Sequence, residues 1–299
     1  MTLPREVLPG RVYLFTRRCT QRQFLMRPDP ETNNAFIYCL AVAANRFGMK
    51  VMFTMPESNH HHTGALDSEG KHPEFLELFH KLFAKCQNSL RGRWENFWAA
   101  EQPSVVRLRS PSDVLDKMVY ALSNPVKDHL VDKATDWPGA SSLKATLNGT
   151  QLTAHRPKHF FRENGSMPEQ VTLKLYRPPG YEHLTQEQFA ALIIERIAKV
   201  ERRAREKRRG GRVLGVKAVL RQCPTDTPQT RAQRRQTNPR VAAKNKWQRI
   251  EALRRNKVFQ LAYAKAREAF SWGWGNVMFP EGTYWLRRFA GVLVPLPAQ

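Results

Sequence analysis

The chain has 299 residues, of which 41% are hydrophobic and 10% aromatic, so it is long enough to bury a sizeable core and is not disordered throughout. Its 49 Lys and Arg residues outnumber 26 Asp and Glu residues, and the net charge of +23 predicts an acidic polymer, above all nucleic acid, as the partner. No apolar run approaches the roughly 20 residues that span a bilayer, and the N-terminus lacks the apolar core of a signal peptide, so we expect a cytoplasmic, nucleoid-associated protein without a membrane partner.

The N-terminal part of the chain predicts strands and helices in alternation. Residues 12–16 and 50–55 predict strands, and apolar residues spaced three and four apart predict a helix over residues 33–47. The histidine segment that follows predicts a third strand, antiparallel to the second; Pro73 then opens a second helix, and residues 105–108 predict a fourth strand. The order β-α-β-β-α-β predicts an α+β fold, a ferredoxin-like split βαβ antiparallel sheet with helices on one face.

A further helix is predicted over residues 111–123. Its apolar stripe repeats at i, i+3, i+4 and i+7 and consists of Leu115, Met118, Val119 and Leu122. At about 100° per residue, Tyr120 lies roughly 100° or more from every member of that stripe, so its side chain faces away from the core of the helix. Such a tyrosine is either an ordinary amphipathic residue at a rim or a functional phenol. Asn124, four residues later, shares its face if the segment is helical.

Three consecutive histidines, His60, His61 and His62, follow the second strand. In an extended strand His60 and His62 point to the same side and make half of a metal site; the alternative is a solvated polar patch in a loop. A carboxamide such as Asn124 would add a third ligand, and this set suits Mn²⁺ or, with more water, Mg²⁺ while leaving room for a phosphate oxygen. The phenol of Tyr120 becomes a competent nucleophile once it is deprotonated near such a cation.

The positive charge is concentrated in the C-terminal part of the chain. Residues 191–260 carry 21 Lys and Arg residues and five acids, which is +16 of the net +23. Together with the turn-forming residues 178–180, this change in composition predicts a first domain over residues 1–145, a linker over 146–180, and a basic, mainly helical DNA-binding extension over 181–299.

Two amphipathic helices are predicted in this extension, over residues 190–209 and 244–270. Basic side chains along such a helix are expected of a surface that follows DNA phosphates, and the alternative is a solvated basic helix without a ligand. The candidate DNA-binding residues are Arg202, Arg203, Arg205, Lys207, Arg208, Arg209, Arg234 and Arg235.

Sequence motifs in the N-terminal part match a known pattern. Tyr-x-x-x-Asn-Pro-Val is present over residues 120–126, Asp-Trp-Pro-x-x-Ser over 136–141, and a Met-Pro segment leads to Asn-His-x-His over 55–62. By these motifs the chain resembles the REP-associated tyrosine transposases, a branch of the single-strand HUH transposases with one catalytic tyrosine. The resemblance covers about residues 9–142, so the first domain is expected to be a HUH single-tyrosine transposase domain.

The resemblance implies roles for four residues. His60 and His62 are the expected ligands of Mg²⁺ or Mn²⁺, Asn124 completes the metal site, and Tyr120 is the expected nucleophile. The implied enzyme is a metal-dependent tyrosine transposase that cleaves single-stranded or hairpin DNA through a 5′-phosphotyrosine, as a monomer or homodimer. Two alternatives remain: a non-catalytic basic nucleic-acid-binding protein derived from a transposase, and a metal-dependent nuclease that uses water.

Two features of the histidine segment depart from the family pattern. Glu57 and Ser58 lengthen the turn, so His60 follows Met55 by five residues. The central position, usually bulky and apolar, is His61. A histidine at such a position must be neutral and hydrogen-bonded, or else exposed.

Overall fold

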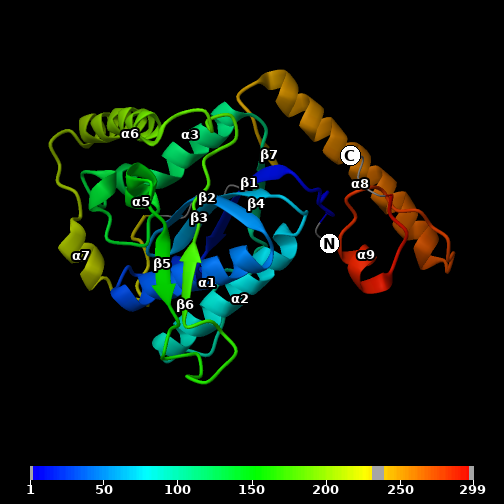
Figure 1. The fold of residues 1–299 in the computed structure, drawn as a ribbon, viewed down its shortest axis with the longest axis horizontal. Helices are drawn as coiled ribbons and strands as arrows, with labels where there is room; N and C mark the ends of the chain where they lie inside the picture. Colours follow the sequence, from blue (N-terminus) through cyan, green and yellow to red (C-terminus); the bar gives the residue numbers. More distant parts are fainter. Residues whose placement is uncertain (1–2, 231–238, 296–299) are drawn as a thin grey trace.

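The computed structural model of the chain describes residues 3–230 and 239–295 and shows a mixed α+β fold, the class that the sequence predicts. The main sheet has five strands in the order β2-β3-β1-β4-β7, and β5 and β6 form a separate pair (Figure 1). The strands are β1 (Arg11–Arg18), β2 (Met49–Pro56), β3 (His60–Asp67), β4 (Ser104–Leu108), β5 (Leu152–His155), β6 (Gln170–Leu173) and β7 (Val241–Ala242). The helices are α1 (Pro30–Arg46), α2 (His72–Leu90), α3 (Pro111–Leu122), α4 (Asn124–Lys127), α5 (Leu143–Asn148), α6 (Gln186–Arg208), α7 (Val216–Arg221), α8 (Lys246–Ser271) and α9 (Trp285–Ala290), with 3-10 turns η1 (Thr20–Arg22) and η2 (Ala134–Asp136).

The strand β1 lies at the centre of the main sheet. It pairs antiparallel with β3 on one side and with β4 on the other, and β2 pairs antiparallel with β3. The short strand β7 pairs in parallel with β4, so the prediction of a fully antiparallel sheet is wrong at this edge. The two residues of β7 belong to the basic extension, and they are too few to form an alternating pattern that marks a strand.

Helices cover both faces of the sheet, so the prediction of helices on one face is wrong. Tyr13 and Phe15 of β1 pack in a first core with α1 and α2, whereas Leu14 packs in a second core with α3 and α6. All three side chains are buried, and successive residues of a strand point to opposite faces. An uninterrupted apolar run of this kind is typical of a strand that is covered on both sides.

A β-bulge in β2 decides which of its side chains face the second core. The pairing of β2 with β3 shifts between Val51 and Phe53, so that Val51 lies in the first core and Phe53 in the second. The Phe53 ring crosses β3 at Gly64, where an added Cβ would lie 2.1 Å from a ring carbon. A side chain at this position would force the buried Phe53 ring to move, so the glycine allows the ring to lie across β3, the strand that begins with His60.

The segment predicted to be a linker is folded against the first core. β5 and β6 pair with each other, and Leu152, Ala154, Val171 and Leu173 pack on the side of α1. In the extension, Ile193 of α6 lies in the second core with α3. The domain boundaries stay a prediction, but residues from all three predicted parts share the two cores.

The helices α8 and α9 form the end of the molecule farthest from α6 (Figure 1). Arg255 Nε on α8 donates to Glu6 Oε1 (3.0 Å), and the amide of Val7 donates to the Gly282 carbonyl (3.0 Å). Phe279 is fully buried in a small third core between these helices. The N-terminal segment therefore lies against the C-terminal helices. Among the helices that the structure describes, none has the length and apolar character needed to cross a membrane.

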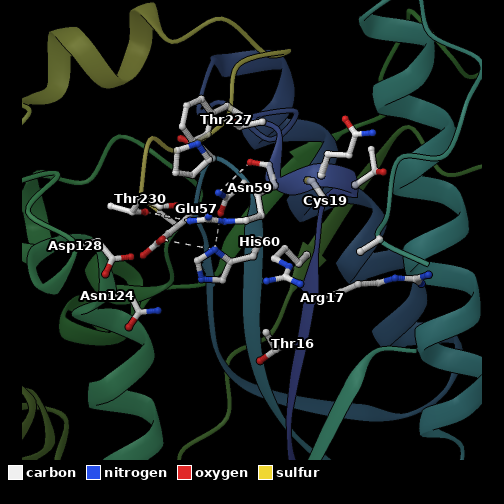
Figure 2. Close-up of a pocket in the computed structure, with 18 of the residues that line it drawn as sticks. Thr16, Arg17, Cys19, Glu57, Asn59, His60, Asn124, Asp128, Thr227 and Thr230 are labelled. Carbon is white, nitrogen blue, oxygen red and sulfur yellow. Dashed lines mark hydrogen bonds and ion pairs between the residues drawn. The ribbon is translucent and has the colours of Figure 1, made fainter. Parts of the chain in front are cut away.

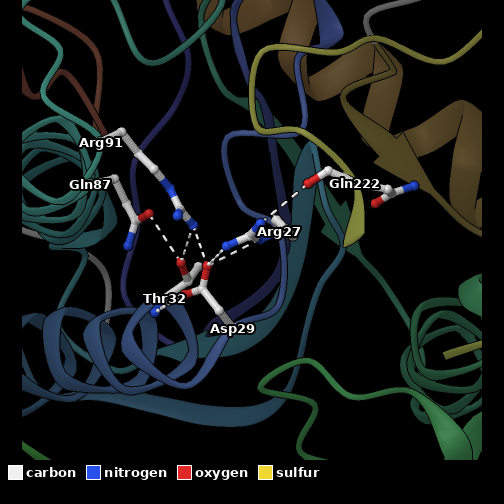
Figure 3. A network of polar contacts seen from close by, with 6 residues as sticks. All are labelled: Arg27, Asp29, Thr32, Gln87, Arg91 and Gln222. Atoms are coloured by element: carbon white, nitrogen blue, oxygen red, sulfur yellow. Dashed lines mark hydrogen bonds and ion pairs between the residues drawn. The ribbon is translucent and has the colours of Figure 1, made fainter. Parts of the chain in front are cut away.

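Asp29 joins the start of α1 to the end of α2. It accepts from the Thr32 amide (2.8 Å), and its carboxylate also accepts from Arg27 (3.1 Å) and Arg91 (2.5 Å) (Figure 3). Burial alone would raise the pKa of Asp29, but the hydrogen bonds from Arg91 and Thr32 outweigh it and lower that pKa. Arg27 also donates to the Gln222 carbonyl (3.4 Å), which ties a distant segment to this network.

Candidate active site

Strand β3 places its three histidines on opposite faces of the sheet. His60 and His62 share one face, with ring centroids 4.9 Å apart, and the His62 ring lies 5.8 Å from that of Tyr120 on α3. His61 points the other way, and its ring packs edge-on to Phe36 in the first core. The two-residue repeat of an extended strand therefore pairs His60 with His62, as the sequence predicts.

Each of the paired histidines has its Nδ1 engaged, which leaves Nε2 for a ligand. His60 Nδ1 lies 2.8 Å from Asn59 Oδ1, and His62 Nδ1 lies 2.7 Å from Thr16 Oγ1. Burial, with the charge of Arg18 adding to it, lowers the pKa of His60 to about 4, and burial lowers the pKa of His62 well below its usual value. Both rings are thus neutral at pH 7, which is the form that binds metal ions.

Tyr120 projects from α3 away from the apolar stripe of that helix and is 45% exposed. The ammonium of Lys127 lies 3.3 Å from the centroid of the tyrosine ring and donates to the Tyr120 carbonyl oxygen (2.7 Å). Burial raises the pKa of the phenol, Asp128 and Glu57 raise it further, and a hydrogen bond with the Asn124 side chain lowers it. The phenol is therefore protonated at neutral pH, and it must lose its proton to become an attacking phenolate.

An open cavity of about 2410 Å³ brings the predicted catalytic and metal-binding residues together. His60, His62, Tyr120 and Asn124 all line it, although they come from β3, α3 and α4. Figure 2 shows His60 and Asn124 on neighbouring parts of its wall. Small-molecule sites usually have volumes of about 300–1,000 Å³, so this cavity has the size for a section of polymer.

The cavity also contains basic residues that the sequence did not single out. Arg17 and Arg18 at the end of β1, Arg22 in η1 and Lys127 at the end of α4 line it. Burial lowers the pKa of Arg17 to about 10 and that of Lys127 to about 8. Arg18 lies opposite His60 in the pairing of β1 with β3. This neighbour relation is the signal that would have identified it, and it requires the strand pairing to be known.

One wall of the cavity is formed by Leu214, Gln222 and residues 225–230, which belong to a segment far from the histidines in sequence (Figure 2). The Leu214 amide donates to the His129 carbonyl (2.9 Å), and the Phe24 amide donates to the Asp226 carbonyl (2.9 Å). These bonds join the segment to the loop after α4 and to the loop after η1. No pattern in the polar, proline-containing sequence of this segment indicates its place at the site.

The donor groups of the cavity fit a divalent cation that keeps water in its shell. His60 and His62 offer two imidazole nitrogens on rings oriented by hydrogen bonds at Nδ1, and Asn124 offers an amide oxygen. Within residues 3–230 and 239–295, no three side chains of His, Cys, Asp or Glu form a group that could hold a metal ion. A third protein ligand would therefore be an amide oxygen, and Mg²⁺ and Mn²⁺ accept such mixed shells.

Six of the eight predicted DNA-binding residues are described by the structure, and these six lie outside this cavity. In the part of the chain that the structure describes, the following six lie at the end of α6 and do not line it: Arg202, Arg203, Arg205, Lys207, Arg208 and Arg209. Arg208 donates to Asp132 (2.5 Å), which attaches this end of α6 to the loop that follows α4. Arg234 and Arg235 lie outside the described residues.

Comparison with known proteins gives a structural match at low sequence identity. No protein-family model matches the chain, and no curated protein matches it. A solved structure described as a REP-associated tyrosine transposase bound to a REP hairpin is similar, with a TM-score of 0.43 and 17% sequence identity. The match covers 56% of this chain and 97% of that chain. We therefore derive the function from the cavity itself.

Proposed function

We propose that the protein is a DNA transposase, a single-stranded DNA endonuclease and strand transferase with Tyr120 as its nucleophile. The observation that carries this proposal is the meeting of Tyr120, His60 and His62 in one cavity, with the rings of Tyr120 and His62 5.8 Å apart. A phenol beside two neutral imidazoles is the set of groups that metal-assisted attack by tyrosine requires. The resemblance in sequence to HUH transposases and the strand order β2-β3-β1-β4, which suits a split βαβ sheet, both agree with it.

In the proposed reaction the phenol oxygen of Tyr120 attacks a phosphorus atom of the DNA backbone. A bond forms between the tyrosine oxygen and phosphorus, the bond from phosphorus to the 3′ oxygen breaks, and the phenol proton passes to that leaving oxygen. The products are a 5′-phosphotyrosine and a free 3′-hydroxyl. When the 3′-hydroxyl of another strand attacks the phosphotyrosine, the same steps in reverse join the DNA to a new end. Each step exchanges one phosphate ester for another, so no further reactant is needed.

The cavity supplies positive charge where the reaction develops negative charge. Lys127 lies over the tyrosine ring, where its ammonium stabilises the phenolate and holds the ring in place. Arg18, which lies opposite His60 in the pairing of β1 with β3, lines the same cavity and is the residue that we assign to a phosphate beside the cleaved bond. A Mg²⁺ or Mn²⁺ ion held by the two histidines and Asn124 would polarise the phosphate.

Covalent trapping tests the proposed function. Labelled hairpin DNA is incubated with the protein and Mn²⁺ or Mg²⁺, and the mixture is then denatured. We expect a protein–DNA adduct that survives the denaturant and does not form when the metal is chelated. If the DNA binds but no adduct forms, the protein is the non-catalytic basic nucleic-acid-binding protein. The net charge of +23 favours such binding. Cleaved DNA without an adduct would identify a nuclease that uses water.

We assign the binding of hairpin or flanking DNA to the basic end of α6. Each phosphate that a basic residue neutralises contributes about 0.7 to the slope of log affinity against log salt for single-stranded DNA. Replacing Arg202, Arg203 and Arg205 together with Ala should therefore lower that slope by about 2. The matched control replaces Lys81 and Lys85, exposed residues of α2 on the other side of the sheet, and should leave the slope unchanged. Equal slopes in both variants would remove α6 from the DNA-binding surface.

A further inference from the structure

Residues 225–230, which we call the polar wall, line the cavity although they belong to the basic extension. The Phe24 amide donates to the Asp226 carbonyl (2.9 Å), and the Arg22 guanidinium donates to the Thr230 carbonyl (2.6 Å). Hydrogen bonds near both of its ends therefore hold the polar wall against η1 and the loop after it. The proposed reaction gives this wall no role.

The lengthened turn between β2 and β3 holds the same segment. Ser58, one of the two residues that lengthen the turn, donates its hydroxyl proton to Gln222 Oε1 (2.7 Å). Asn59, the last residue of the turn, donates to the carbonyl of Arg22, the residue whose guanidinium holds the polar wall (3.2 Å). The longer turn thus ties the polar wall to the strand that begins with His60.

The polar wall differs in charge from the rest of the extension. Residues 222–230 contain one acid and no Lys or Arg, whereas residues 191–260 carry 21 Lys and Arg in total. Thr227 and Gln229 are exposed, and no hydrogen bond among the described residues engages either side chain. Figure 2 shows Thr227 above His60 in this view of the cavity. Hydroxyl and amide groups donate to and accept from base edges, but they lack the charge that attracts phosphates.

An aromatic ring lies next to the polar wall. Phe24 is partly buried and lines the cavity, and its amide holds the wall at Asp226. Unpaired bases stack on aromatic rings, and they do so in proteins that bind single-stranded nucleic acid. The positive charge of the cavity is found elsewhere, at Lys127 beside Tyr120. The cavity therefore has a basic part at the proposed nucleophile and a neutral part at the polar wall.

We propose that Phe24 and the polar wall form a subsite for unpaired bases of the DNA strand that enters the cavity. One base stacks on the Phe24 ring, and the Thr227 hydroxyl and the Gln229 amide contact base edges. The phosphates of the same strand lie toward Lys127. This subsite makes binding depend on the bases near the cleaved bond as well as on the phosphates. The inference rests on the proposed function, which supplies single-stranded DNA as the ligand.

The test measures the affinity of the full chain for a hairpin with a single-stranded flank, with EDTA present so that no metal-dependent cleavage occurs. A second DNA has abasic sites along the flank, which removes the bases and keeps the phosphates. We expect the wild type to bind the abasic DNA about 10-fold more weakly. Phe24→Leu should weaken binding of the normal DNA by a similar factor and leave binding of the abasic DNA unchanged, because the interaction needs both the ring and the base.

The matched control is Phe47→Leu. Phe47 is a partly buried ring just after α1 that does not line the cavity, so this variant should bind both DNAs like the wild type. Circular dichroism checks that each variant is folded. If Phe24→Leu is unstable, Thr227→Ala combined with Gln229→Ala decides the question, because both side chains are exposed. This variant should reduce the preference for the normal DNA by about 5-fold.

The outcomes separate this inference from the proposed function. If the wild type binds both DNAs equally, or if the folded variants of the subsite keep the full preference for the normal DNA, the inference is wrong. Neither result affects the covalent adduct at Tyr120, so the proposed function stands. If the preference depends on Phe24 but the wild type forms no adduct with metal present, the proposed catalysis fails and the subsite remains. If the wild type binds neither DNA, both fail.

Discussion

The two faces of β3 give the same type of residue opposite surroundings. On one face, His60 and His62 border the open cavity next to Tyr120. On the other face, His61 is fully buried and packs against Phe36 in the first core. A run of three histidines therefore contains two kinds of histidine, and the side of the sheet distinguishes them. A polar motif is evidence of function only after its residues are divided between the faces of their strand.

His61 is held in the core by a second buried histidine. Its Nε2 lies 3.0 Å from His80 Nε2, and its Nδ1 lies 3.2 Å from Thr63 Oγ1. One ring must donate and the other accept, so the pair is satisfied when both rings are neutral. Burial lowers the pKa of His61 to about 3 and the pKa of His80 well below its usual value. The sequence predicted that a histidine at this position is either neutral and hydrogen-bonded or exposed, and the structure shows the buried, hydrogen-bonded alternative.

The largest effect is expected on the cavity side, at Tyr120. Tyr120→Phe removes only the attacking oxygen, so cleavage and the covalent adduct should fall to background while hairpin affinity changes little. Adduct formation on denaturing gels and DNA affinity are measured on the same preparation. Tyr263→Phe on α8, far from the cavity, is the control and should keep full activity. An adduct that persists in Tyr120→Phe would place the nucleophile elsewhere.

The next largest effect is expected at the paired histidines. His60→Ala or His62→Ala removes one imidazole of the proposed metal site, so metal-dependent cleavage should fall by at least about 100-fold. A titration of cleavage rate against Mn²⁺ concentration measures the loss. Hairpin affinity without metal serves as the folding control. Full cleavage by either variant would show that the cavity face of β3 does not hold the ion.

An effect on stability, and not on cleavage, is expected at His80. Burial lowers its pKa below the 6.5 of an unperturbed histidine, so the unfolded chain takes up the proton first as the pH falls. The contribution of His80 to the free energy of unfolding is therefore complete above pH 6.5 and decreases below it, by about 1.4 kcal/mol per pH unit. His80→Leu should lower the free energy of unfolding at pH 8 by about 1–3 kcal/mol, because it leaves His61 without its partner.

His80→Leu should lose less free energy of unfolding than the wild type as the pH falls from 6.5 to 4. Urea unfolding across this pH range measures both quantities, with Mn²⁺ absent. Parallel curves for the wild type and His80→Leu would mean that this histidine is not held neutral in the core.

The smallest effect on cleavage is expected at His61. His61→Leu replaces the ring with an apolar side chain of similar size, and this side chain faces the first core and not the cavity. The cleavage rate should stay within a few-fold of the wild type, in contrast to His60→Ala. If His61→Leu proves as damaging as that variant, the distinction between the two faces of β3 does not hold.

The features that could be predicted from the sequence are those that depend on the periodicity of a single strand or helix. The alternation of a strand predicted the pairing of His60 with His62, and the spacing of α3 predicted that Tyr120 faces away from its own core. Both depend on residues a few positions apart. The place of α6 was not predicted, because its apolar side depends on a surface of α3 that is distant in sequence. The burial of Glu57 was not predicted either, because it depends on how the turn packs.

The packing of α6 on α3 has a consequence for shortened and chimeric forms of this protein. Ile193 and Ile197 lie in the same core as Leu115 and Met118 of the helix that carries Tyr120, and the same helix α6 ends in its run of arginines. A chain that ended before residue 186 would expose the apolar side of α3 to solvent. The shortened protein would therefore lose solubility as well as the arginines of α6. The helix with the tyrosine and the helix with the arginines therefore depend on each other for folding, and a chimera of two relatives should exchange both helices or neither.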